Sequence, residues 1–169
     1  LSDYVGDYGE ILAVDYADMP LRIARQKIIR KSFNNITCLK KDVLQNGFPK
    51  GNFDGVVIAY GLRNLSDPKE GLREIRRLLK PGGKAGILDF RSFDSDLFGA
   101  RFQKFYLRKF VVPIATIFGL GKEYAYLEKS LKCFPSGINQ KKMALDLGFK
   151  NACFKSIAFG QMGILLLEN

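Results

Sequence analysis

The chain has 169 residues, 47% of them hydrophobic, so it is long enough to bury one core and too short for two comfortable domains. Its 27 Lys and Arg against 17 Asp and Glu give a net charge of +10, which favours anionic partners without choosing among phospholipids, nucleic acid and phosphorylated substrates. The absence of histidine excludes Ser-His-Asp hydrolysis, Cys-His proteolysis and histidine-ligated metals. We expect a single domain over residues 1–169.

The first predicted elements are a strand, a helix and a second strand. Short β-branched runs alternate with amphipathic stretches along the chain, which predicts an α/β fold with a mostly parallel sheet. Residues 10–16 form a buried-strand run, and residues 17–31 read as a helix with Asp18 as the N-cap. A second strand is expected at 35–42 and a third at 53–60.

The best-marked element is a helix that follows the third strand. Asp67 is its expected N-cap, Pro68 stands at the first helical position and Glu70 at the third. Lys80, Pro81, Gly82 and Gly83 should end it, and residues 84–90 should form a fourth strand. The two last runs, 151–159 and 162–168, are expected to form an antiparallel pair.

The chain has three cysteines, Cys38, Cys133 and Cys153, which are far apart in the sequence and form no CxxC motif. This pattern supports neither a disulfide framework nor a zinc site, and it fits a reducing, cytoplasmic setting. We expect no metal. The longest apolar stretch, residues 110–121, contains a proline and is only about half a bilayer span, so we expect no transmembrane helix.

Candidate ligand groups follow three of the predicted strands. In open α/β sheets, ligands bind beyond the carboxyl ends of the strands. Asp15, Asp42 and the pair Tyr60 and Gly61 stand at such ends. An acid there can accept hydrogen bonds from both ribose hydroxyls of a nucleotide. The alternative for an isolated acid is that it only caps the next helix.

A glycine-rich turn is expected about 20 residues before a ribose-binding acid. Only 14 residues precede Asp15, and Gly6 and Gly9 do not follow a strand. We therefore expect that the chain begins inside the first helix of its fold and is a fragment that lacks the first strand and its glycine loop.

Several segments, in this order, resemble one family. They are "ILAVDYADMP", "KKDVLQNGFP", "FDGVVIAYGLRNLSDPKEGLREIRRLLKPGG" and "ILDF". Together they resemble the ubiquinone/menaquinone C-methyltransferase family, within the Rossmann-like class I methyltransferases that use S-adenosylmethionine. The GLRN tetrapeptide before a capped helix and LKPGG is specific to that family. The later "KEYAYLEKSLKCFPSG" and "GQMGILLLE" extend the resemblance to nearly the whole chain, and are most similar to the cyanobacterial and plastid branch that methylates demethylphylloquinone.

The resemblance implies a cofactor site for S-adenosylmethionine. The implied roles are Asp15 for the ribose, Tyr16 and Met19 beside the adenine, Asp42 and the backbone of Val43 for the adenine edge, and Ala59 and Tyr60 beside the methionine portion. For Met19 and Tyr60 the alternative is ordinary core packing. For Asp42 it is an exposed turn residue.

Arg63 is the candidate catalytic residue. A quinol ring carbon attacks a methyl group only when the neighbouring hydroxyl carries phenolate character, and a fixed cation near that oxygen favours this form. Arginine stays protonated and cannot be the base. The proton is expected to leave through an ordered water, a carboxylate or a tyrosine such as Tyr126. The alternative is that Arg63 and Asn64 only hold the loop before the helix.

Residues 91–135 are expected to form a substrate lid. Within them, the early part of 101–134 places aromatic residues on one helical face and basic residues on another, and an apolar run around Pro113 follows. The aromatic residues are Phe102, Phe105 and Tyr106, and the basic ones are Arg101, Lys104 and Arg108. A prenyl or phytyl quinone is a membrane lipid, so such a lid would contact a membrane surface peripherally and receive the tail. The alternatives are ordinary core packing and RNA binding, and no RNA-binding signature supports the latter.

The sequence thus predicts methylation of a prenylated naphthoquinol ring. Two alternatives stay open: a methyltransferase of the same fold that acts on RNA or another small molecule, and a catalytically inactive binding module. The sequence makes no prediction about the oligomeric state.

Overall fold

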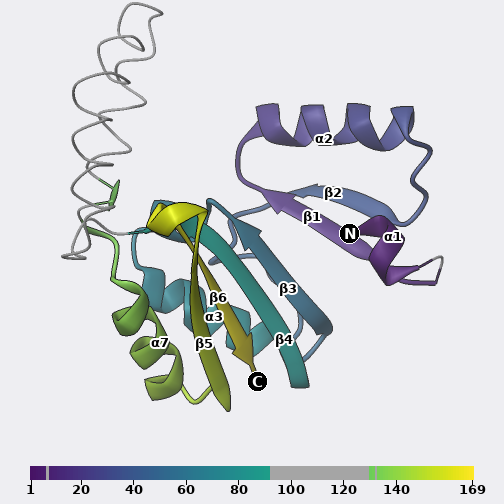
Figure 1. Cartoon of the computed structure of the whole chain (residues 1–169). Coiled ribbons are helices and arrows are strands. Elements are labelled where there is room, and N and C mark those ends of the chain that lie inside the picture. Colours follow the sequence, from purple (N-terminus) through teal and green to yellow (C-terminus); the bar gives the residue numbers. More distant parts are fainter. Residues whose placement is uncertain (7, 92–129, 132) are drawn as a thin grey trace, which may run out of the picture. The chain divides into compact units, whose positions relative to one another are not determined.

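The computed structural model describes residues 1–6, 8–91, 130–131 and 133–169 (Figure 1). Contacts divide the chain into two compact units, Leu1–Phe48 and Pro49–Asn169. Each unit is described by itself below. The expectation of one domain over the whole chain stays a prediction.

The first unit is a β-α-β arrangement preceded by a short helix. Its elements are α1 (Ser2–Val5), β1 (Ile11–Asp15), α2 (Asp18–Arg30) and β2 (Ile36–Lys40). β1 and β2 are parallel, with Ile11 opposite Ile36 and Asp15 opposite Lys40. The helix α2 contacts both strands, and its Leu21 is buried. The predicted strands and helix are confirmed, although β2 is shorter than expected.

The predicted N-cap of α2 is wrong by one residue. Ala17 is the N-cap and makes no side-chain capping bond, whereas Asp18 is the first helical residue. Two interactions explain the difference. The N–H of Ala17 donates to Oδ1 of Asp15 at 2.8 Å, and the Asp18 carboxylate pairs with Nζ of Lys40 at 2.6 Å.

The second unit contains a four-stranded mixed sheet. Its strands are β3 (Phe53–Ala59), β4 (Leu79–Phe90), β5 (Asn151–Ile157) and β6 (Met162–Glu168). Their order is β3-β4-β6-β5, so β6 lies between β4 and β5 (Figure 1). β3 and β4 are parallel, and β6 is antiparallel to both of its neighbours. The predicted antiparallel pair is confirmed.

One face of this sheet carries the core. Side chains alternate along the strands, and one set packs with α3 (Pro68–Leu78) and α7 (Gly137–Asp146). The buried residues of this core are Leu62, Leu72, Ile75, Leu79, Ala85, Ile87, Phe134, Ala144, Phe149, Leu165 and Leu167. The alternate set includes Val57 and Leu166, whose side chains are exposed.

The helix α3 has the predicted start. Asp67 is its N-cap and accepts the N–H of Lys69 at 2.7 Å, and Pro68 is the first helical residue. Its end differs from the prediction, because the strand β4 begins at Leu79 and not at residue 84. Asn169 explains this: its Nδ2 donates to the carbonyl of Leu79, and its backbone bonds to the segment that follows.

The helix α7 was not predicted from the sequence. Its N-cap is Ser136, whose Oγ accepts the N–H of Asn139 at 3.4 Å. At its beginning, Gly137 leaves room for the ring of Phe154, and Gly163 on β6 leaves room for the same ring. The aromatic ring therefore occupies the space that side chains at both glycine positions would need.

Candidate active site

The first group of candidate residues lies at the carboxyl ends of β1 and β2. Asp15 is the last residue of β1, and Asp42 follows the end of β2 by two residues. The N–H of Lys41 donates to the carbonyl of Asp15 at 3.1 Å, which ties the two chain segments together. Both acids therefore stand at the same edge of this parallel pair, as the sequence predicted.

Each of these carboxylates uses one oxygen for its own loop. Oδ1 of Asp15 accepts the N–H of Ala17, and Oδ1 of Asp42 accepts the N–H of Leu44, both at 2.8 Å. Neither bond caps a helix, because Ala17 is itself the N-cap of α2 and no helix follows Asp42 directly. Asp42 is an exposed residue before a turn, which is the alternative that the sequence left open for it. Among the described residues, no hydrogen bond uses the second oxygen of either carboxylate, so each acid keeps an acceptor for a ligand.

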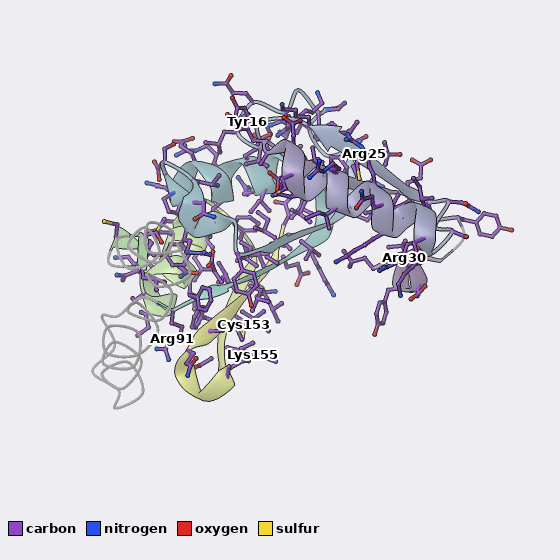
Figure 2. The ribbon with its side chains drawn as sticks, turned by 90° about the horizontal axis from the view of Figure 1, so that it is seen from above. Tyr16, Arg25, Arg30, Arg91, Cys153 and Lys155 are labelled. Carbon is purple, nitrogen blue, oxygen red and sulfur yellow. The ribbon has the colours of Figure 1, made fainter. Side chains whose placement is uncertain are left out.

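Two large side chains beside these acids are exposed. Tyr16 is 74% exposed and Met19 is 64% exposed, so neither is a core residue. Tyr16 lies beside the beginning of α2, at the opposite end of that helix from Arg30 (Figure 2). An exposed ring and a thioether next to carboxylates suit a ligand that has an apolar heterocycle and hydroxyl groups.

The loop after β2 is held by Asn46, a residue that sequence reasoning missed. Asn46 is 3% exposed, and its Nδ2 donates to the carbonyl of Val43 at 2.7 Å. Its Oδ1 accepts the N–H of Phe48 at 2.8 Å, and its carbonyl accepts Nζ of Lys41 at 2.7 Å. The Asn-Gly pair at 46–47 was the available signal. Within the described part of the chain, the N–H of Val43 makes no hydrogen bond.

The second group lies at the carboxyl end of β3. Tyr60 follows Ala59, the last residue of that strand, and has a φ of 57°. This left-handed conformation is uncommon for a bulky residue and persists only where the surroundings impose it. Here the carbonyl of Tyr60 accepts Nη1 of Arg63 at 3.1 Å and Nδ2 of Asn64 at 3.0 Å.

Arg63 forms a nearly buried ion pair with Asp89. The residue lies in a 3₁₀ turn, Leu62–Asn64, and its Nη1 is 2.7 Å from Oδ1 of Asp89. The side chains are 11% and 4% exposed. Oδ2 of Asp89 accepts the backbone N–H of Arg63 at 3.1 Å, and Oδ1 also accepts the N–H of Phe90 at 2.9 Å.

Asp89, in the ILDF segment, was not among the site residues predicted from the sequence. The signal was an acid within an otherwise apolar strand run, at a position that alternation places toward the core. A buried carboxylate is normally paired with a cation. The candidate cation, Arg63, follows β3, the strand next to β4.

Arg63 holds its own loop, because its Nη1 donates to the carbonyl of Tyr60, while its Nε donates to no group of the described residues. Its Cζ lies 5.2 Å from the ring centroid of Phe90. Its Nε is buried without a hydrogen-bond partner in the described part of the chain. The catalytic role of Arg63 stays a prediction.

The Tyr60 side chain connects this end of the sheet to β6. Its ring centroid is 5.2 Å from that of Phe90, and its hydroxyl lies 3.1 Å from Sδ of Met162. Tyr60 is 38% exposed, so it is not a core residue. Ala59 is also exposed, which leaves the end of β3 accessible.

Tyr126 and residues 92–129 of the expected lid lie outside the described residues. Among the residues that are described, no group of three acids or cysteines could hold a metal ion. The same part of the chain has no helix that is both long and apolar enough to span a membrane.

Comparison with known proteins gives one family for nearly the whole chain. The model of the ubiE/COQ5 methyltransferase family matches residues 1–166. A 2-phytyl-1,4-naphthoquinone methyltransferase from Trichormus variabilis is 39% identical, over 99% of this chain and 73% of that protein. The protein of that name from Synechocystis is 41% identical, over 97% of this chain and 69% of its own length. A chloroplastic relative from Arabidopsis thaliana is 34% identical, over 98% of this chain and 64% of its own length.

Solved structures of SAM-dependent methyltransferases have a fold similar to that of this chain. A SAM-dependent methyltransferase from Aquifex aeolicus has a TM-score of 0.68 at 17% identity, over 99% of this chain and 72% of that one. A SAM-dependent methyltransferase from Thermotoga maritima has a TM-score of 0.65 at 14% identity, over 98% of this chain and 84% of that one. The predicted fold class, the Rossmann-like class I methyltransferase fold, is confirmed.

Proposed function

Because the chain belongs to the ubiE/COQ5 methyltransferase family, we propose that it methylates a ring carbon of a prenylated naphthoquinol. The expected enzyme class, a methyltransferase that uses S-adenosylmethionine, is confirmed. Its relatives are named for 2-phytyl-1,4-naphthoquinone, which supports the demethylated precursor of phylloquinone as the substrate. Demethylmenaquinol shares the same ring and is the second compound to test.

The residues at the strand ends fit the cofactor. S-adenosylmethionine, when bound, supplies a methyl group on a positively charged sulfur. The second oxygen of Asp15 suits the ribose hydroxyls, and the exposed Tyr16 and Met19 suit the adenine. The carboxylate of Asp42 and the N–H of Val43 suit the adenine edge.

The methionine portion is assigned to the end of β3. The exposed Ala59 and the side chain of Tyr60 lie there, whereas the backbone N–H and carbonyl of Tyr60 are bonded within the protein. This assignment rests on their position at the carboxyl end of a parallel strand, where α/β sheets bind ligands.

One observation carries the proposed chemistry, the nearly buried guanidinium of Arg63 at this strand end. In a water-poor site, a fixed cation that stabilises developing phenolate charge contributes roughly a few kcal/mol to the rate. Asp89 neutralises part of the charge, and Nε remains a free donor within the described residues. The proton leaves through an ordered water, a carboxylate or Tyr126.

The proposed substrate also implies a lipid surface. We expect a cytoplasmic protein that contacts a membrane peripherally through the basic and aromatic lid at 91–135. The net charge of +10 supports attraction to anionic lipids.

A single-turnover assay with radiolabelled S-adenosylmethionine tests the function. The full chain is incubated with the demethylated phytyl naphthoquinol in mixed micelles, or with total RNA. We expect label in a ring-methylated quinol, identified by mass spectrometry, and none in RNA. Label in RNA alone, or quinol binding without methylation, would overturn the proposal in favour of the two alternatives.

A further inference from the structure

We propose that Asp89 is a positioning residue of the methyltransferase site, which acts by fixing Arg63 and, through it, the carbonyl of Tyr60. This inference rests on the proposed function, because it gives the end of β3 a role in binding the cofactor. The role is indirect, since the contacts of Asp89 within the described residues are with Arg63 and Phe90.

The first support is that both carboxylate oxygens of Asp89 accept hydrogen bonds from Arg63, in the turn Leu62–Asn64. It is 4% exposed, and it accepts Nη1 and the backbone N–H of Arg63 as well as the N–H of Phe90. A carboxylate that holds both ends of one arginine fixes the position of its backbone and the direction of its side chain. Charge-assisted bonds of this kind are short and strongly directional.

The second support is that the same Nη1 continues to Tyr60. It donates to Asp89 at 2.7 Å and to the Tyr60 carbonyl at 3.1 Å. Asn64 adds a bond to the same carbonyl, and the N–H of Tyr60 donates to the carbonyl of Leu88 at 2.8 Å. Asp89 thus contacts Arg63, and Arg63 contacts Tyr60, the residue in the strained left-handed conformation.

The third support is location. Asp89 and Tyr60 stand at the carboxyl ends of two neighbouring parallel strands, next to the exposed Ala59. Ligands of such sheets bind at that edge. Asp89 belongs to the same buried row of β4 as the core residues Ala85 and Ile87, and both oxygens of its carboxylate are hydrogen-bonded there.

Asp89→Asn is the direct test, because it keeps the shape and removes the charge. Asp54→Asn is the matched control: Asp54 also pairs with a cation, Lys80, but its side chain is 86% exposed and lies at the start of β3. We expect Asp89→Asn to weaken binding of S-adenosylhomocysteine several-fold by calorimetry. We also expect it to lower the single-turnover rate by on the order of 10- to 100-fold at saturating cofactor, as for a misplaced reactive group. The control should change neither.

A double variant separates positioning through Arg63 from an independent effect. If Asp89 acts through Arg63, then adding Asp89→Asn to Arg63→Gln should change the rate by less than about twofold, because residues that act as a unit are not additive. A full further loss in the Arg63→Gln background would overturn the proposal.

The role of Asp89 can be tested even if a single variant fails to fold. If Asp89→Asn or Arg63→Gln alone fails to fold, the double variant lacks the unpaired buried charge and is the one to measure. A folded double variant, or a folded Asp89→Asn, with normal affinity and normal rate would overturn the positioning role. If the wild-type protein binds S-adenosylhomocysteine but methylates no quinol, the substrate proposal fails, while the affinity measurements still decide the role of Asp89.

Discussion

Asp15 and Asp42 make the same contact: each accepts, through Oδ1 at 2.8 Å, the backbone N–H of the residue two positions further along the chain. Such a contact shapes the loop that follows a strand. It also turns each carboxylate so that one oxygen serves the protein and the other is left for a ligand. A substitution that keeps the acceptor but removes the charge separates these two uses.

Asp15→Asn is that substitution. We expect it to keep the turn at Ala17 and to weaken binding of S-adenosylmethionine by about 1 to 3 kcal/mol, because the ribose hydroxyls lose a charged acceptor. Calorimetry measures the affinity. Asp18→Asn is the control, since it removes only the exposed pair with Lys40 and should leave the affinity unchanged. Equal affinities for wild type and Asp15→Asn would remove Asp15 from the cofactor site.

Variants of Arg63 separate chemistry from loop holding. Arg63→Lys should keep the fold and the cofactor affinity and lower the turnover, because an ammonium cannot reproduce the planar fork. Arg63→Ala should reduce the rate by on the order of 100-fold. It should also cost about 3 to 5 kcal/mol of stability, because Asp89 is then buried without its partner.

These effects are measured on the same samples by thermal unfolding, calorimetry and single-turnover methylation. Arg73→Ala is the control, because Arg73 pairs with Glu70 on the surface of α3 and should affect none of these values strongly. A normal rate per folded, loaded Arg63→Ala enzyme would mean that this arginine holds the loop and does no chemistry.

The space around the Phe154 ring predicts a packing effect. A methyl group at Gly163 would meet this ring, and so would a methyl group at Gly137. Gly163→Ala should therefore destabilise the protein by about 1 to 3 kcal/mol in urea unfolding. Gly86→Ala is the control, since its added methyl group would lie 3.9 Å from Leu166, an ordinary contact. If Phe154→Leu fails to reduce the cost of Gly163→Ala, the steric explanation is wrong.

The pair of Asp54 and Lys80 predicts a pH dependence at acid pH. The hydrogen bond and charge of Lys80 lower the pKa of Asp54 below 3.8. The pair therefore stabilises the folded state fully above a pH of about 3.8, the ordinary pKa of the aspartate. This contribution is lost as the pH falls through the lower pKa of Asp54 in the folded state. We expect Asp54→Asn to melt slightly below wild type near neutral pH, and the difference to vanish in acid and in high salt. A difference that persists in acid would show that the pair is not its cause.

The sequence predicted the elements whose signals are local. Asp67 and Pro68 mark the start of α3 in the sequence, and the structure has the helix begin there. The apolar runs likewise predicted each strand that the structure describes, with errors at the ends. Leu79 shows why: it begins β4 because Phe53 pairs with it and Asn169 bonds to its carbonyl, and neither partner is close in sequence.

The same limit explains what was missed at the site. Asp15 and Asp42 could be found because strand ends are visible in the sequence and the carboxyl ends of two paired parallel strands lie at one edge. Tyr60 could be found in the same way, from the end of β3. Asp89 and its bond to Arg63 join residues 26 positions apart in the chain. No local pattern encodes such a contact, and an acid in a strand indicates only that some partner must exist.

The position of β6 has a consequence for how the protein is made. β6 lies between β4 and β5 but follows both in the chain. During synthesis, β5 leaves the ribosome before β6, so the neighbour with which it pairs in the finished sheet does not yet exist. The pairing of β4 with β6 must also close a long loop, which slows folding. The edge of β4 that pairs with β6 therefore stays open until β6 emerges, and in that interval the nascent chain is exposed to pairing with another molecule.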